Sequence, residues 1–289
     1  MNKSIPTYQL NILSNQDEGA LDVLLLNERV ETQRVQIDIP YRSNYYGVGI
    51  CLNGKAELKA NLESYTIEPK CIIAMSPQVI KQWNYKSADF EILTILFTKN
   101  FITTNNNLNL DQFQFFESVA NHSFQISAAQ SENISAFLNL LKQKYETSHT
   151  YRNEILKNFI NILLYDIASI YNQQNFSNDV KQTRGQLLAS DFKKLVNVHF
   201  TAERSVKFYA DKLFVTPKHL TETVKEATGK TAGEWIDETV ILEAKVLLQN
   251  VALTIAEISD TLHFSDQSTF GKFFKNITGL SPVAYKQTL

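Results

Sequence analysis

The sequence predicts an α+β chain of several domains, with a β-rich N-terminal part that also carries helices and an all-α C-terminal part. Three observations predict this fold class. Short runs of β-branched and aromatic residues fill residues 20–98. Apolar residues at helical spacing follow from about residue 132, and one helical pattern occurs twice within residues 205–279. Because the two kinds of periodicity occupy different parts of the chain, we expect separate β-rich and helical domains.

Turn signals such as Asn53-Gly54, Pro69 and Pro77 separate the expected strands. Residues 55–60 alternate polar with apolar side chains, which is typical of a strand with one buried face. Several short strands at this spacing predict a small barrel or a sandwich. The six expected strands are residues 33–40, 45–52, 56–60, 64–68, 71–75 and 90–97.

After an Asn-rich loop at 103–109, two helices are expected at residues 132–146 and 153–172. The apolar arc of the second is wider than one barrel face needs. Burial on two sides within its own domain and a dimer interface both explain this arc, and both stay open. The polar stretch at 172–182 lacks apolar periodicity, so it is expected to be an interdomain linker. From Leu187 a new helix is expected to open the C-terminal domain.

One pattern of helix, tight turn and helix is repeated about fifty residues further along the chain. The first copy runs from Ser205 to Gly229 and the second from Thr254 to Gly279. The second turn holds one extra residue. The matching positions, first copy before second, are Ala210 with Ser259, Leu213 with Leu262, Leu220 with Phe270, Val224 with Phe274, and Thr228 with Thr278.

The residue types in both copies suit a helix-turn-helix. The small residues at 210 and 259 let a second helix cross closely. Thr216 and Ser265 stand where a hydroxyl caps the second helix, followed by Pro217 and Asp266, which helix starts favour. Glycine ends each copy, as a C′ residue does. A single amphipathic helix pair is common in ordinary packing, whereas two aligned copies favour second helices that face a DNA major groove.

With these motifs, residues 204–287 closely resemble the AraC/XylS family of bacterial transcription regulators. The most specific part runs from Ile255 through the segment 264–270 to Tyr285. The family usually has glycine where this chain has His263. A residue other than glycine at positive φ costs on the order of 1 kcal/mol, so a strained or differently shaped turn is expected there.

The resemblance implies a domain order for the whole chain. It implies a cupin-like β-barrel sensor domain at 1–130, a helical dimerisation segment at 131–174, a linker at 175–186 and a double helix-turn-helix DNA-binding domain at 187–289. It also implies a homodimer on double-stranded promoter or operator DNA, with RNA polymerase and a small-molecule effector as further candidate partners.

Alignment with the family also implies which side chains face DNA. Gln267 suits adenine N6/N7, Lys272 suits guanine O6/N7, and Glu222 suits cytosine N4. Helix starts and an ammonium suit phosphates instead. For each of these residues a solvated surface position remains the alternative. The expected base-facing residues are Lys218, Thr221, Glu222, Gln267, Ser268, Gly271 and Lys272, and the expected phosphate contacts are Thr216, Ser265 and Lys275.

A long apolar-striped helix is expected at 233–249, between the two copies, with Trp235 in its core-facing stripe. Such a connector sets two reading helices about 34 Å apart, one turn of DNA. One chain then reads two successive major grooves.

The charge balance is unusual for a DNA-binding domain. The chain carries 28 Lys and Arg against 30 Asp and Glu, and residues 183–289 hold 13 basic and 12 acidic residues. Because the domain has no strong excess of basic residues, we expect weak non-specific DNA binding and a modest dependence of DNA affinity on salt.

Composition also limits the other function classes. The two cysteines, Cys51 and Cys71, form no metal-ligand spacing and are expected to be buried, and no apolar run reaches the length of a membrane span, so a reducing cytoplasm is expected. No histidine occurs within residues 1–121, whereas a metal-dependent cupin enzyme needs imidazole ligands on its strands. We therefore expect no enzyme activity, no metal and no cofactor.

The rival class is a small-molecule-binding or enzymatic cupin protein with a helical appendage. An effector pocket in the N-terminal part is expected to be apolar and aromatic, and barrel packing is the alternative role for its candidate residues. These candidates are Tyr45, Tyr46, Trp83 and Tyr85.

Overall fold

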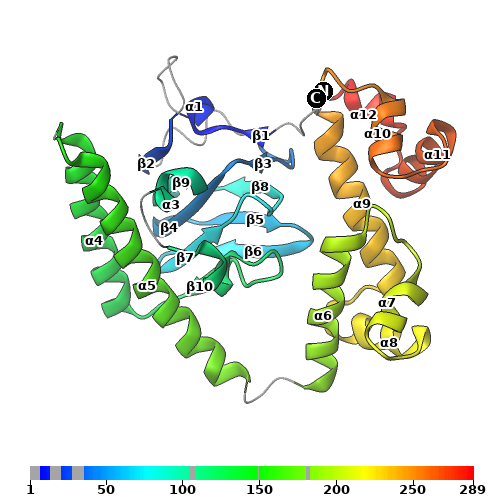
Figure 1. The fold of residues 1–289 in the computed structure, drawn as a ribbon, viewed down its shortest axis with the longest axis horizontal. Helices are drawn as coiled ribbons and strands as arrows, with labels where there is room; N and C mark the ends of the chain where they lie inside the picture. The colour runs from blue at the N-terminus through cyan, green and yellow to red at the C-terminus, as the bar shows by residue number, and fades with distance from the viewer. Residues whose placement is uncertain (1–6, 14–20, 28–35, 105–107, 149, 180–182) are drawn as a thin grey trace. The chain divides into compact units, whose positions relative to one another are not determined.

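The computed structural model describes residues 7–13, 21–27, 36–104, 108–148, 150–179 and 183–289. The chain divides into two compact units, an N-terminal unit at Thr7–Val180 and a C-terminal unit made mainly of Lys181–Leu289 (Figure 1). The first contains the sheets and the second is helical. This agrees with the expected α+β multidomain class.

The N-terminal unit contains two antiparallel sheets. The larger has the strand order β10-β7-β4-β9-β2 and the smaller has β6-β5-β8. A short parallel pair joins β1 (Thr7–Tyr8) to β3 (Arg42–Ser43). The strands of the larger sheet are β2 (Val23–Asn27), β4 (Tyr45–Asn53), β7 (Cys71–Met75), β9 (Glu91–Thr98) and β10 (Ser123–Gln125). Those of the smaller sheet are β5 (Ala56–Ala60), β6 (Glu63–Ile67) and β8 (Lys81–Lys86).

The larger sheet is buried on both faces. On β4, Tyr45 and Cys51 pack into a core shared with the smaller sheet, whereas Tyr46, Val48 and Ile50 pack on the opposite side. This opposition follows from the strand period of two. Among the described residues the strands pair into separate sheets that face each other as a sandwich. No strand pairing in the described part of the chain closes these sheets into a barrel.

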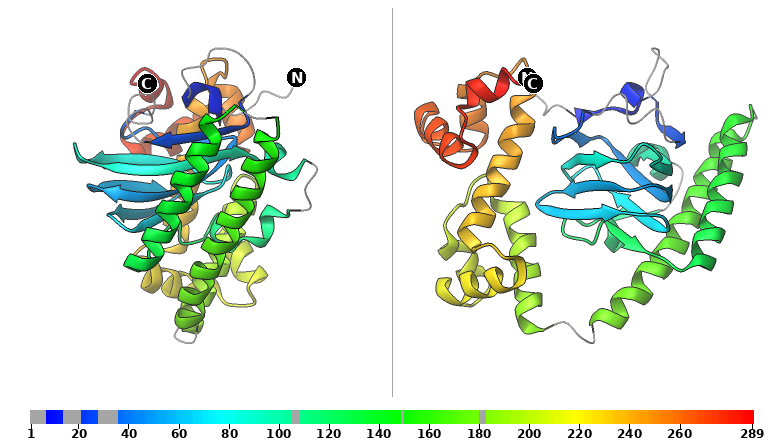
Figure 2. Two further views of the ribbon diagram at one scale, coloured as in Figure 1. Left: turned by 90° about the vertical axis from the view of Figure 1, so that its left-hand side faces the viewer. Right: turned by 180° about the vertical axis from the view of Figure 1, so that it is seen from behind.

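Helices cover the other face of the larger sheet. Here α4 (Ala128–Glu146) and α5 (Arg152–Asp179) lie side by side (Figures 1 and 2). A capping box between Ser127 and Gln130 fixes the start of α4. Leu156, Ile160 and Leu163 on α5 are fully buried in this core. Short elements connect sheet and helices: α3 (Lys99–Thr103) and two 3-10 turns, Leu110–Gln112 and Gln114–Phe116. A short helix, α1 (Leu10–Leu13), lies near the start of the chain.

Five of the six expected strands are confirmed to within two residues at each end. The strand expected at 33–40 is wrong where it is described: residues 36–40 contain a turn, and Asp38 has a φ of 65°, which no strand tolerates. Its first three residues lie outside the described residues. The sequence patterns missed β8, whose residues are mostly polar, and the short strands β2 and β10.

The linker expected at 175–186 is helical at both of its ends. Helix α5 continues to Asp179, and α6 (Arg184–His199) begins with a capping box between Thr183 and Gln186. The boundary between the two units falls at 180–181, within the expected range. Polar composition therefore did not exclude a helix at either end of this range.

The C-terminal unit is an all-α domain built around one long helix, α9 (Ala232–Leu248). Two helix pairs lie at its two ends (Figure 1). The first is α7 (Val206–Lys212) with α8 (Pro217–Thr228), and the second is α10 (Ile255–Thr261) with α11 (Gln267–Thr278). A final helix, α12 (Pro282–Lys286), packs against α11. Over the residues described, no helix has both the length and the apolar character required to cross a membrane.

Candidate nucleic-acid interface

The two turns have the same hydrogen-bonded geometry. The Val215 amide donates to the Ala210 carbonyl at 3.0 Å, and the Phe264 amide donates to the Ser259 carbonyl at 3.0 Å. The residue before each amide donor has positive φ, 57° at Phe214 and 54° at His263. The expected strain at His263 is therefore confirmed, and Phe214 shares it.

The crossing of the two helices in each pair depends on small, fully buried side chains. Ala210 and Ser259 both have 0% exposure. The core-facing residues Leu220 and Phe270 of the second helices are also fully buried. The second helix of each pair is thus fixed through one face, and its opposite face is available to solvent.

The starts of α8 and α11 are capped by different chemistry. Thr216 caps α8, where its Oγ1 accepts from the His219 amide at 3.2 Å, as expected. Asp266, not Ser265, caps α11, with Oδ1 accepting from the Thr269 amide at 2.8 Å. The cap expected at Ser265 is therefore wrong, because the extra residue in the second turn moves the helix start by one position.

Ser265 supports that cap from outside the helix. Its hydroxyl donates to Asp266 Oδ2 at 3.0 Å. Hydrogen bonds from the backbone and side chain of Thr269, and then from Ser265, lower the pKa of the Asp266 carboxyl. The first turn of α11 therefore carries a fixed negative charge beside an exposed helix start.

The expected base-facing side chains lie on the exposed faces of α8 and α11. On α8, Lys218 and Glu222 form an exposed i,i+4 pair with Nζ and Oε1 3.9 Å apart. The Thr221 hydroxyl is turned inward and donates to the Pro217 carbonyl at 2.8 Å. Of the residues expected to contact DNA from α11 and its start, Ser265, Gln267, Ser268, Lys272 and Lys275 are exposed, and Gly271 is partly exposed.

Gly271 has open space around it, since a Cβ built there meets no atom within 4 Å. Its partner in the first copy is Thr221, so a side chain is tolerated at this position. The glycine leaves a gap on α11 between Gln267 and Lys272, which allows a bulky group to approach the helix backbone.

The repeat extends beyond the second helices, which the sequence patterns missed. Gly229 and Gly279 end them with φ of 78° and 79°. Thr231 then caps α9 and Ser281 caps α12. The signal was present in the sequence, because a hydroxyl residue follows each Thr-Gly pair at the same spacing.

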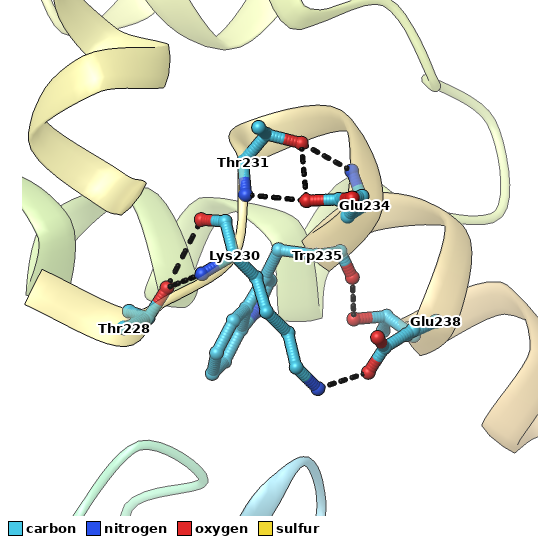
Figure 3. A network of polar contacts seen from close by, with 7 residues as sticks. Thr228, Lys230, Thr231, Glu234, Trp235 and Glu238 are labelled. Atoms are coloured by element: carbon cyan, nitrogen blue, oxygen red, sulfur yellow. Dashed lines mark hydrogen bonds and ion pairs between the residues drawn. The ribbon is translucent and has the colours of Figure 1, made fainter. Parts of the chain in front are cut away.

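Figure 3 shows this junction in the first copy. The Thr228 hydroxyl accepts from the Lys230 amide at 3.2 Å. It also donates to the Val224 carbonyl at 2.8 Å. Thr231 and Glu234 form a capping box, and Lys230 pairs with Glu238 on the next turn of α9. This network fixes the direction in which α9 leaves the first helix pair.

Arg204 connects the two helix pairs through a contact that no sequence pattern signals. It precedes α7, and its guanidinium donates to the Leu262 carbonyl at the end of α10. The same group lies 3.5 Å from the centroid of the Phe264 ring. Burial lowers the pKa of Arg204, and the nearby Asp237 partly offsets this. The start of the first pair is therefore fixed to the turn of the second.

The aromatic residues expected to line an effector pocket are divided by the fold. Tyr45 and Trp83 line a cavity between the two sheets of the N-terminal unit. Tyr46 points into the opposite core, stacked on Phe97 with centroids 5.8 Å apart, and Tyr85 is 49% exposed.

Comparison with known proteins agrees with the helix-turn-helix expected in the C-terminal unit. Residues 209–288 match the family model described as helix-turn-helix domain. The Msm operon regulatory protein of Streptococcus mutans is 31% identical over 97 residues, or 34% of this chain and 35% of that protein. The arabinose operon regulatory protein of Salmonella typhimurium is 27% identical over 92 residues, or 32% and 31%. This chain spans about a third of the length of these curated relatives.

Among solved structures, ToxT from Vibrio cholerae with unsaturated fatty acid bound is 17% identical, and the match covers 95% of this chain and 98% of that one. The TM-score of 0.41 is too low to establish a common arrangement. The domain model, by contrast, matches residues 209–288, which hold most of both helix pairs. The C-terminal unit of this chain therefore contains a helix-turn-helix domain similar to those of bacterial operon regulators, which agrees with the expected resemblance to the AraC/XylS family.

Proposed function

We propose that the protein is a sequence-specific DNA-binding transcription regulator, in which each chain inserts α8 and α11 into successive major grooves. The observation that carries the proposal is the repeated turn geometry at both ends of α9, which exposes the same face of each second helix. A helix of 17 residues is about 26 Å long, which suits two reading helices about one DNA turn apart.

The two reading helices make unequal contributions in this proposal. On α8 the ammonium of Lys218 is paired with Glu222, which lowers its attraction for phosphate or guanine. On α11, Lys272 and Gln267 are exposed and offer a cation and an amide for bidentate base contacts. Lys275, Thr216 and Ser265 are assigned to phosphates. Specificity is therefore expected to come mainly from α11.

A gel-shift assay with the promoter DNA next to the protein's own coding sequence tests the proposal. Lys272→Ala and Gln267→Ala are each expected to lose about 1–3 kcal/mol of binding free energy at particular base positions. Lys59→Ala removes the same charge as Lys272→Ala from an exposed position on β5 and is the matched control. Equal losses on all DNA sequences would assign Lys272 and Gln267 to the phosphate backbone instead.

The same gel-shift assay tests the rival class of protein. A small-molecule-binding or enzymatic cupin protein with a helical appendage is expected to give no sequence-selective shift under any effector condition. An enzyme of that kind is also expected to turn over a small molecule. Either DNA selectivity or turnover therefore decides between the two classes.

The N-terminal unit is assigned to sensing and dimerisation, in a cytoplasmic homodimer. A cupin-like barrel is proposed for its sheets, supported by the two facing sheets and their common core. Exposed apolar side chains on α4 and α5, Leu140, Ile162 and Tyr165, support a dimer interface. Ile162→Arg is expected to shift the chain towards monomer in sedimentation, whereas Lys59→Ala on β5 leaves the oligomeric state unchanged. An effector at the N-terminal unit is proposed to change how the DNA-binding domains are presented to DNA or RNA polymerase.

A further inference from the structure

The cavity between the two sheets of the N-terminal unit has a volume of about 40 Å³. That is room for about three water-sized groups. Aliphatic side chains from both sheets line part of its wall, including Leu58, Ile92 and Leu96. Aromatic rings, two glycines and a few polar side chains line the rest, so the cavity combines apolar surface with a few donors.

The cavity exists because β4 presents two glycines on its inter-sheet face. Tyr45, Gly47, Gly49 and Cys51 alternate along that face, and Gly47 and Gly49 line the cavity. A Cβ added at Gly47 would lie 2.8 Å from Leu96 Cδ2, and one at Gly49 would overlap Thr94 Oγ1. The backbone of β4 is therefore exposed to the cavity, as at sites where a ligand approaches a strand closely.

A buried ammonium lies in the same wall. Lys81 is 5% exposed, and its Nζ donates to Ser43 Oγ and lies 5.0 Å from the centroid of the Tyr45 ring. Two backbone hydrogen bonds with Tyr41, of 2.8 and 2.9 Å, fix the position of Lys81. Because electrostatic interactions are strong at low dielectric, an ammonium at this depth favours an anionic ligand.

Two further residues that line the cavity hold a buried polar atom without a hydrogen-bond partner among the described residues. These atoms are the Trp83 indole Nε1 on β8 and the Thr94 Oγ1 on β9. Their side chains are 5% and 6% exposed, so bulk water does not replace the missing partners. Native proteins rarely leave such groups unpaired. The indole only donates and the hydroxyl can donate, so both suit acceptor oxygens.

We propose that this cavity binds a short-chain carboxylate. Its oxygens accept hydrogen bonds from Lys81 Nζ, Trp83 Nε1 and Thr94 Oγ1, and its short hydrocarbon part lies against Leu58 and Ile92. Lys81 supplies the positive charge that attracts an anion. The two oxygens of a carboxylate suit donors that come from both sheets. The small cavity volume limits the length of the hydrocarbon part. The role of this ligand as a regulator of DNA binding rests on the function proposed above.

The test labels both tryptophans of the full-length protein with 5-fluorotryptophan and follows them by ¹⁹F NMR. The chain has two tryptophans, Trp83 in the cavity wall and Trp235 on α9. Acetate, propionate and butyrate are titrated, with butyramide as the neutral match and inorganic phosphate as the other anion. The Trp83 resonance is expected to shift with at least one carboxylate, with a Kd of about 1 mM or tighter, and Trp235 serves as the internal reference.

Three variants locate the ligand. Lys81→Met keeps the length of the side chain and is expected to weaken carboxylate binding by at least about tenfold, the loss expected for a buried charge-assisted contact. Thr94→Val keeps the shape and is expected to weaken binding severalfold. Gly47→Ala meets only the flexible end of Leu96, so the strand is expected to fold while binding of the carboxylate that shifts Trp83 is lost. The titrations of the unmodified chain decide the proposal even if Lys81→Met does not fold.

The contradicting results are distinct from failure of the regulator function. If no carboxylate shifts Trp83, the cavity holds only water and the inference is wrong, whether or not the chain binds DNA. Equal shifts with butyramide or with phosphate also overturn the carboxylate assignment. If a carboxylate shifts the Trp83 resonance but the chain does not bind DNA, the ligand site is supported. The proposed role of that ligand in transcription regulation is then wrong.

Discussion

Phe214 and His263 adopt the same left-handed backbone conformation at equivalent positions of the two helix-turn-helix turns, with φ of 57° and 54°. Each lies directly before the residue whose amide closes the turn onto Ala210 or Ser259. The Phe214 side chain is 96% exposed, so no packing compensates for its backbone. Both turns therefore hold a conformation that favours glycine.

Replacing either residue with glycine is expected to stabilise the C-terminal domain. His263→Gly and Phe214→Gly each remove left-handed strain, and part of the gain is offset by the freedom of glycine in the unfolded chain. The net rise in unfolding free energy is about 0.5–1 kcal/mol. Urea unfolding followed through the ¹⁹F signal of Trp235 measures it.

The opposite change provides the control for this prediction. Gly279 has φ of 79° with nothing within 4 Å of a built Cβ, so Gly279→Ala is expected to destabilise the domain by strain alone. A loss of stability in His263→Gly would instead show that the imidazole makes a favourable interaction.

Acid is expected to weaken the start of α11. Hydrogen bonds from Thr269 and Ser265 lower the pKa of Asp266 in the folded state. A lowered folded pKa means that this stabilisation is present above the unfolded pKa of about 3.9 and is lost as the pH falls through the folded pKa. Asp266→Asn keeps a capping side chain that does not titrate. Its unfolding midpoint is expected to change less than that of the unmodified chain below about pH 4.

Mild acid is expected to act on the N-terminal unit through His122. This residue is 1% exposed, and burial lowers its pKa to about 4 even though its Nδ1 contacts the Ala74 carbonyl at 3.1 Å. The unfolded chain takes up the proton near pH 6.5 and the folded chain only near 4, so stability falls between these values.

The expected loss is on the order of 3 kcal/mol at most, from the difference in pKa. Unfolding followed through the ¹⁹F signal of Trp83 from pH 7 to pH 4 measures it. His122→Leu is expected to flatten this dependence, because the variant has no proton to take up. An equally steep dependence in His122→Leu would assign the effect to other groups.

Removing the charge of Glu222 is expected to strengthen DNA binding. Glu222→Gln releases Lys218 from its pair and removes a negative charge from the exposed face of α8. The plot of log affinity against log salt is expected to become steeper by up to about 0.9, the value for one more phosphate contact. Glu226→Gln on the same helix is the matched control. A loss of affinity confined to particular base pairs in Glu222→Gln would assign Glu222 to base reading.

The sequence by itself determined the C-terminal domain. Its signals are local: a cap at Thr216, glycine at the ends of the two second helices, and apolar residues four apart such as Phe270 and Phe274. Each signal acts within one or two helical turns, so it can be recognised without knowing what the helix packs against. The pairwise repetition of these signals then predicted two similar units.

Only the tertiary structure decided the interior of the N-terminal unit. The β4 segment is apolar nearly throughout, so its pattern does not tell which of Tyr45 and Tyr46 faces the smaller sheet and which faces the helices. Strand pairing and the packing of α4 and α5 fix that choice. They also bring Lys81, Trp83 and Thr94 to one cavity. Such contacts join residues from different strands, and no local pattern encodes them because their energy depends on the partner that the fold supplies.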